Sequence, residues 1–287
     1  MDINQLFGSQ PSENESQTEV KQKTISLVNY LNTKPLIYGL EKNLVKHDYI
    51  LQKDVPSVCA DRLLEGEVEL GIIPSIEYAR SKGAWKIVPE LCIASQGAVK
   101  SVNLFFKKDL RDLRKIAVDT GSRTSVALLK ILLRERYQME PELVPMPPDL
   151  ERMLQQADAA LVIGDRALHY QHNHESYLDL GEEWFDLTGL PFVYAFWAGH
   201  ELSINEEDVK LLQESYRFGE RHLDDICTRF AADKDFPPSF YRAYLTENIH
   251  YQFGEAEKEG LKEFYNYAFY FGFIEHIPEL HFYGEES

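Results

Sequence analysis

The chain has 287 residues, 44% of them hydrophobic and 12% aromatic, a composition typical of a globular protein with a sizeable core and, by its length, about two domains. Its 47 acidic and 30 basic side chains give a formal net charge of −17, which argues against nucleic acid or an anionic membrane as a partner, because both attract basic surfaces. No apolar run approaches the roughly 20 residues that a membrane-spanning helix requires.

The negative charge is confined to one half of the chain. Residues 1–150 carry 20 acidic and 20 basic side chains, so the other half, with 27 acidic and 10 basic, holds the whole −17. Within it, residues 201–287 hold 19 acidic and 8 basic side chains, or −11. The total therefore does not exclude a small anionic ligand, which responds to local hydrogen-bond donors.

The segment 1–23 is polar and lacks a basic stretch followed by an apolar one, so it does not resemble a secretory signal and is predicted to be a disordered leader. Cys59, Cys92 and Cys227 are far apart and show no CxxC or metal-ligand spacing, as expected in a reducing compartment. The sequence thus predicts a cytoplasmic protein.

From Thr24 onward, short apolar and β-branched runs alternate with amphipathic segments, which is typical of βα units and parallel sheets. Strands are expected at residues 24–31, 49–53, 68–73, 86–95, 101–107, 115–119, 141–145, 159–163 and 192–198. Helices are expected at residues 35–41 and 57–66, where Gly66 can provide a left-handed stop, and after Pro74 and Pro148.

From Asn205 onward the pattern indicates helices alone. One apolar stripe in steps of three and four predicts a long helix over Val209, Leu212, Tyr216, Gly219, Leu223, Ile226 and Phe230. Packing of this stripe on its own domain is favoured because the repeat is short and contains a glycine; a coiled-coil seam, and with it a homodimer, is the alternative. Two more helices are expected at residues 238–248 and 255–272.

The strands at 101–108 and 192–199 flank a self-contained βα block of about ninety residues, so we expect them to cross between two α/β lobes. The first lobe is predicted to comprise residues 24–106 and 197–287, including the C-terminal helices. The second comprises residues 107–196. A ligand would then bind in the cleft between the lobes, where strand ends and helix starts converge.

The most informative motif is the segment 119–125, which lies between an apolar strand and a strongly amphipathic helix. It offers four consecutive donor-bearing residues, Ser122, Arg123, Thr124 and Ser125. A helix start of this kind binds carboxylate or phosphate well, although plain capping by Ser122 or Thr124 would explain part of the pattern. The segment is not a Walker A loop.

Three further segments place polar residues where strands end or begin. Asn32 and Thr33 follow the first strand, although an asparagine there could also be a simple turn former. Ser101 and Asn103 share one face of a crossing strand, and Gly164 and Asp165 follow another strand. The histidines at 169, 172 and 174 lack metal-ligand spacing, and no GxSxG, HExxH or GxGxxG motif occurs. We therefore expect neither a metal nor a cofactor.

Six segments, in order along residues 24–200, together resemble the chorismate dehydratases of the futalosine route to menaquinone. They are VNYLNTKPL, EGEVELGIIPSIEY, KSVNLF, DTGSRTSVALLKILL, PPDLERMLQQADAALVIGDRAL and WFDLTGLPFVYAFWA. The resemblance implies a two-lobed fold of the type II periplasmic-binding-protein kind. It also implies a hydro-lyase that removes water from chorismate to give 3-[(1-carboxyvinyl)oxy]benzoate, without a cofactor.

By this resemblance, Asn32 and Ser101 correspond to the catalytic residues that approach the departing C4 hydroxyl. Residues 122–125 correspond to the carboxylate-binding loop. Thr33, Asn103, Gly164 and Asp165 are further candidates for substrate binding. Neither Asn32 nor Ser101 is a competent base at neutral pH, so our hypothesis is that they bind the hydroxyl while the enolpyruvyl carboxylate of the substrate removes the C3 proton.

Two alternatives remain open. The 1,4-dihydroxy-6-naphthoate synthases of the same pathway share the fold, but an SPCPND-like start to the first helix would be expected there, whereas this chain reads VNYLNTKP. A solute-binding protein without catalysis would bind a carboxylate unchanged, but would normally carry an export signal.

Overall fold

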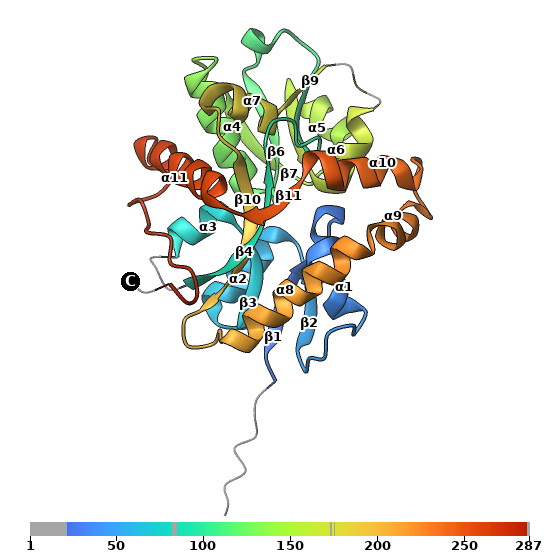
Figure 1. The fold of residues 1–287 in the computed structure, drawn as a ribbon. Helices are drawn as coiled ribbons and strands as arrows, with labels where there is room; N and C mark the ends of the chain where they lie inside the picture. The colour runs from blue at the N-terminus through green and yellow to red at the C-terminus, as the bar shows by residue number, and fades with distance from the viewer. Residues whose placement is uncertain (1–21, 82–84, 173, 175, 286–287) are drawn as a thin grey trace, which may run out of the picture.

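The computed structural model describes residues 22–81, 85–172, 174 and 176–285, which form two β-sheets with helices packed around them (Figure 1). Of the predicted leader, only residues 22 and 23 lie within the described residues. Lys23 is not free there, because its ammonium group forms a 2.5 Å ion pair with the buried carboxylate of Asp208.

The first sheet has six strands in the order β11-β4-β10-β3-β1-β2. Their bounds are Thr24–Val28 (β1), Ile50–Asp54 (β2), Leu70–Pro74 (β3), Trp85–Ser95 (β4), Phe192–His200 (β10) and His250–Phe253 (β11). β1 is parallel to β2 and β3, whereas β10 is antiparallel to β3 and β4. The helices that follow its strands are η1 (Leu31–Thr33), α1 (Lys34–Glu41), α2 (Pro56–Glu65) and α3 (Ser75–Arg80).

The second sheet has five strands in the order β7-β6-β8-β5-β9 and occupies the upper part of Figure 1. Its strands are β5 (Val102–Phe106), β6 (Lys115–Asp119), β7 (Glu142–Met146), β8 (Ala159–Ile163) and β9 (Tyr177–Asp179). Its helices are η2 (Leu110–Asp112), α4 (Arg123–Glu135), α5 (Leu150–Gln156), α6 (Gly164–Gln171) and α7 (Leu180–Thr188). β6 is parallel to both neighbours, so the loops after β6 and β8 open at the same edge.

The chain crosses between the two sheets at residues 96–101 and 189–191. The predicted lobe boundaries differ from these crossings by several residues. β5, predicted for the first lobe, pairs with β8 and β9 in the second sheet. The N-terminal half of β10, predicted for the second lobe, pairs within the first sheet. The crossings are short loops that precede these strands, whereas the prediction treated the strands themselves as the crossings.

The C-terminal block contains five helical elements in addition to β11. They are α8 (Glu206–Arg221), α9 (Leu223–Ala231), α10 (Pro238–Ala243), the π-helix η3 (Tyr244–Asn248) and α11 (Glu255–Tyr270). The long helix predicted from the apolar stripe is two helices, because the backbone leaves the helical conformation at His222 (φ −117°, ψ 26°). The stripe nevertheless packs on the same chain: a Cβ on Gly219 would lie 1.9 Å from the carbonyl oxygen of Pro35 in α1.

Several local predictions are confirmed. Gly66 ends α2 in the left-handed conformation (φ 71°), and the helix expected after Pro148 is α5, which the Asp149 side chain caps by accepting from the backbone N–H of Arg152. β9, β11 and α7 were not predicted. β9 and β11 have three and four residues, too few to show a clear alternation. No helix among the described residues has the length and apolar character needed to cross a membrane.

Candidate active site

A cleft lies between the two sheets, with roughly 600 Å³ of space not filled by atoms, part of it open to solvent. Eight of the ten predicted site residues line it, namely Asn32, Thr33, Ser101, Ser122, Arg123, Thr124, Ser125 and Gly164. The rest of its wall is largely apolar and includes Val28, Ile72, Ile93 and Val102. Asn103 and Asp165 lie behind the wall. The fold thus brings polar side chains from the ends of β1 and β6 and from the start of β5 into one cleft.

The described wall of this cleft contains no carboxylate, imidazole, amine or thiol; Arg123 is the one charged residue in it. Two tyrosines, Tyr30 and Tyr194, complete its polar surface. Burial raises the pKa of Tyr30 to about 12, helped by the nearby carboxylates of Asp119 and Asp165, so its hydroxyl stays protonated at neutral pH. The wall therefore offers hydrogen-bond donors but no strong base.

Asn32 lies in η1, immediately after the first strand. The backbone on both sides of it is fixed by side chains from distant elements. The carboxylate of Asp165 accepts a hydrogen bond from the N–H of Leu31 (2.9 Å), and the hydroxyl of Tyr251 donates to the carbonyl oxygen of Asn32 itself (2.9 Å). Asn32 is thus held by α6 of the second lobe and by β11 of the C-terminal block.

Asp165 does not line the cleft; it anchors the turn that carries Asn32. Burial raises the pKa of its carboxyl to about 6, although the hydrogen bond from Leu31 acts in the opposite direction. Because the folded state holds this proton more tightly than the unfolded chain, the free energy of unfolding falls as the pH rises from about 4 to 6.

We expect Asp165→Asn to remove this cost, because asparagine keeps an acceptor for Leu31 but carries no charge. At about pH 7 the variant should be more stable than the wild type by about 1–2 kcal/mol, after allowance for solvent screening of a half-buried group. The gain should shrink as the pH falls through 6 to 4. Thermal unfolding over this pH range measures it, and a gain independent of pH would contradict the assignment.

Ser101 ends the first crossing between the sheets. The turn before it contains Lys100 in the left-handed region (φ 61°), which is uncommon for a residue with a Cβ. The buried carboxylate of Asp179 holds this turn by accepting hydrogen bonds from the backbone N–H groups of Val99 (3.0 Å) and Lys100 (2.6 Å), and it also caps α7 through the N–H groups of Gly181 and Glu182. Asn103 stabilises the same turn, because its side-chain amide donates a hydrogen bond to the carbonyl oxygen of Lys100 (2.9 Å).

Gly164 lies at the start of α6, which contacts η1 through Asp165. It adopts a left-handed conformation (φ 65°), and a Cβ there would come within 3.3–3.4 Å of the ring of Tyr30. A glycine is therefore favoured at this position twice over, by its backbone conformation and by the close approach of an aromatic ring that also lines the cleft.

The polar residues at the start of α4 have two different roles: Ser122 and Ser125 line the cleft, and Thr124 contacts α3. Ser122 occupies the N-cap position of α4, but its side chain makes no capping hydrogen bond, so the simple capping interpretation does not hold for it. The hydroxyl of Thr124 instead accepts a hydrogen bond from the N–H of Ile76 in α3 (3.2 Å). Ser122 and Ser125 face the cleft at the positive end of the α4 dipole, where an anion is stabilised.

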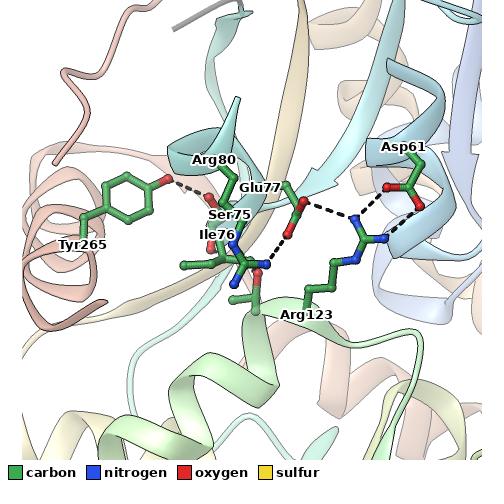
Figure 2. A network of polar contacts seen from close by, with 8 residues as sticks. Asp61, Ser75, Ile76, Glu77, Arg80, Arg123 and Tyr265 are labelled. Atoms are coloured by element: carbon green, nitrogen blue, oxygen red, sulfur yellow. Dashed lines mark hydrogen bonds and ion pairs between the residues drawn. The ribbon is translucent and has the colours of Figure 1, made fainter. Parts of the chain in front are cut away.

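Arg123 joins the two lobes (Figure 2). Its guanidinium forms a bidentate pair with Asp61 of α2, with both N···O distances 2.8 Å, and a further bond of 3.1 Å to Glu77 of α3. These are carboxylates of the first lobe, whereas Arg123 belongs to the second. Arg123 therefore lines the cleft with its guanidinium already engaged by two protein carboxylates.

We expect Arg123→Gln to loosen the contact between the lobes. The N–H of Ile76 reports on it, because its acceptor is Thr124 of the same loop. Loss of a partly exposed bidentate pair of about 1.4 kcal/mol should speed hydrogen exchange at this amide about 10-fold. Arg136→Gln is the matched control, since Arg136 pairs with Glu183 inside the second lobe. Equal protection of Ile76 in the wild type and Arg123→Gln would refute the lobe-joining role.

Sequence reasoning missed two residues that contact candidate catalytic residues, Tyr251 at the carbonyl oxygen of Asn32 and Tyr244 at Ser101. The hydroxyl of Tyr244, in η3, donates a 2.9 Å hydrogen bond to Oγ of Ser101. Its separation of 143 residues from Ser101 leaves no local sequence signal. Among the described residues, no cluster of three or more His, Cys, Asp or Glu side chains has the geometry of a metal site.

Comparison with solved structures places the fold. A protein from Archaeoglobus fulgidus superimposes with a TM-score of 0.73 at 18% identity, covering 89% of this chain and 100% of that one. The periplasmic aliphatic sulphonate binding protein of Escherichia coli superimposes with a TM-score of 0.60 at 16% identity, covering 90% and 94%. The predicted two-lobed periplasmic-binding-protein-like fold is thereby confirmed.

Comparison of sequences identifies the family. Residues 24–270 match the family described as Menaquinone biosynthesis. The chorismate dehydratase of Thermus thermophilus is 32% identical over 258 residues, covering 84% of this chain and 93% of that protein. The chorismate dehydratase of Campylobacter jejuni is 29% identical over 245 residues, covering 83% and 93%. The chain thus belongs to the menaquinone-biosynthesis family, as its sequence motifs predicted.

Proposed function

We propose that this protein is a chorismate dehydratase, a hydro-lyase that eliminates water from chorismate to give 3-[(1-carboxyvinyl)oxy]benzoate. The names of both curated relatives support the reaction. The cleft supports the substrate class, because neutral donors set in an apolar wall suit a small ring that carries carboxylates and a hydroxyl. Cytoplasmic location and a homodimer remain predictions.

Two parts of the cleft would bind two parts of the substrate. The 121–125 loop, at the start of α4, would take a carboxylate through Ser122, Ser125 and backbone N–H groups. Asn32 and Ser101 would hold the departing C4 hydroxyl from the other side. Anion capture by neutral groups also reconciles a dianionic substrate with a net charge of −17, since these residues all belong to the half whose charges sum to zero.

The single observation that carries the mechanism is the absence of a base from the described wall of the cleft. The C3 proton would pass to the enolpyruvyl carboxylate of the same substrate molecule, and the electron pair of the broken C–H bond would delocalise into the ring carboxylate. The C4–O bond would then break, and the hydroxide would leave with that proton as water. Aromatisation drives the reaction, so the protein has only to orient the substrate and polarise the leaving group.

The test is incubation of the purified protein with chorismate, followed by mass spectrometry. A product lighter than chorismate by one water, with the ultraviolet spectrum of a substituted benzoate, is the expected result. Chorismate bound but recovered unchanged would favour the solute-binding alternative. A protein that neither binds nor converts chorismate would contradict the proposal, and this result would favour the 1,4-dihydroxy-6-naphthoate synthase alternative.

A further inference from the structure

The segment 244–251 contacts both halves of the candidate site through three side chains. Tyr244 donates to Oγ of Ser101, the amide of Asn248 donates to the carbonyl oxygen of Ala98, and Tyr251 donates to the carbonyl oxygen of Asn32, each at 2.9 Å. Asn32 follows β1 of the first sheet, whereas Ser101 ends the crossing into the second sheet, and the two lie 69 positions apart in the chain. A single short segment of the C-terminal block therefore fixes both.

The backbone of this segment is itself unusual. Residues 244–248 form a π-helix, an energetically poor conformation that occurs mostly as short insertions at functional sites. Tyr244 and Asn248, its first and last residues, both reach the crossing that ends at Ser101. The π-helical turn thus allows two of its side chains, Tyr244 and Asn248, to donate hydrogen bonds to the crossing at residues 96–101.

The direction of the hydrogen bond from Tyr244 has a chemical consequence. A tyrosine hydroxyl has one proton, and Tyr244 donates it to Oγ of Ser101. Complete burial raises the pKa of Tyr244 far above its usual value, so it remains a donor across the physiological range. With its oxygen already accepting, Ser101 keeps its own proton for a further partner, and Ser101 lines the cleft.

We propose that Tyr244 is a positioning residue that acts through Ser101, orienting the serine hydroxyl so that its proton points to the departing oxygen of the substrate. The proposal rests on the dehydratase function proposed above. An ordinary buried tyrosine with a satisfied hydroxyl would support the core only. The two roles differ in what happens when Ser101 is absent.

The experiment is a double-substitution cycle with Tyr244→Phe and Ser101→Ala, read by the single-turnover rate of chorismate dehydration. Tyr244→Phe keeps the ring and removes the hydroxyl. In the wild-type background it should lower kcat about 10- to 30-fold and change KM less than about 2-fold, because the substrate contacts of the wall are kept. In the Ser101→Ala background the further fall should be much smaller, because only the weaker interaction of the Tyr244 hydroxyl with the Asn32 side chain is then left to lose.

Tyr78→Phe is the matched control, since Tyr78 is equally buried and its hydroxyl donates to the carbonyl oxygen of Glu279, away from the cleft. It should leave kcat unchanged. An equal fall in kcat on adding Tyr244→Phe to both backgrounds, or a rise in KM alone, would overturn the proposal, because either result means that Tyr244 acts on shape and not through Ser101.

A second readout separates failure of this proposal from failure of the dehydratase function. Thermal unfolding needs no substrate, and Tyr244→Phe should lower the midpoint by roughly 2–4 °C in the wild-type background. In Ser101→Ala it should leave the midpoint unchanged or raised, because no hydrogen bond to Ser101 is left to lose. If the two substitutions have non-additive effects on the unfolding midpoint but the protein does not convert chorismate, the dehydratase function alone is contradicted. If their effects on the midpoint are additive, the role of Tyr244 is contradicted.

Discussion

Replacement of Ser101 or Asn32 by alanine is expected to lower kcat for chorismate dehydration at least about 100-fold while the protein stays folded. Hydroxide is a poor leaving group, and a preorganised donor aimed at the developing charge contributes on the order of 3 kcal/mol to the rate. Both side chains line the cleft. Tyr244 donates a hydrogen bond to Oγ of Ser101, and Tyr251 donates one to the backbone carbonyl oxygen of Asn32. The loss should appear in kcat more than in KM, because the bond to the departing oxygen strengthens in the transition state.

Two controls separate this effect from a general disturbance. Ser81→Ala removes a buried serine hydroxyl that bonds the carbonyl oxygen of Tyr78, outside the cleft. Asn29→Ala removes an exposed amide three positions before Asn32. Both controls should keep kcat within about 2-fold of the wild type. Near-normal kcat in Ser101→Ala and Asn32→Ala, measured with saturating chorismate, would contradict the catalytic assignment.

Gly219→Ala is expected to have the largest effect on stability. A Cβ at this position would lie 1.9 Å from the carbonyl oxygen and 2.6 Å from the carbonyl carbon of Pro35, so α8 would have to move away from α1. Backbone atoms cannot swing aside as a side chain can, so we expect a loss of about 3 kcal/mol in the free energy of unfolding and a fall of roughly 6–12 °C in the midpoint.

The control for this prediction is Gly71→Ala. Gly71 is also buried, but the nearest atoms to a Cβ there are 3.6 Å away, an ordinary contact distance. Thermal and urea unfolding of both variants should show a change for Gly71→Ala smaller than about 1 kcal/mol. Because α1 follows η1 directly, Gly219→Ala should also reduce activity. A Gly219→Ala protein as stable as the wild type would show that α8 and α1 do not pack as closely as described.

The sequence predicted the site where its residues follow strands. Asn32, Ser122 and Gly164 each come after a strand that the apolar pattern identifies, and the carboxyl ends of such strands converge in an α/β fold. The same reasoning placed Asp165 among the substrate-binding residues, whereas in the structure its carboxylate turns back to the N–H of Leu31. Position along the chain predicts where a residue lies, but not which neighbour its side chain selects.

Contacts between distant segments could not be predicted. Arg123 is engaged by Asp61 and Glu77, and Ser101 by Tyr244, at separations of 46 to 143 residues. Such pairs have no periodicity, because periodicity reports only the local repeat of a helix or strand. The π-helix likewise continues a helical apolar pattern. The sequence therefore predicts one helix over residues 238–248, whereas the structure has an α-helix, α10, followed by the π-helix η3.

A crystal structure of the Ser101→Ala variant with chorismate would show whether chorismate is dehydrated in the cleft between the lobes. The substrate is expected in this cleft, with its C4 hydroxyl within hydrogen-bond distance of the Asn32 amide and a carboxylate at the 121–125 loop. Chorismate bound elsewhere, or bound in the cleft with its C4 hydroxyl turned away from Asn32, would contradict this expectation.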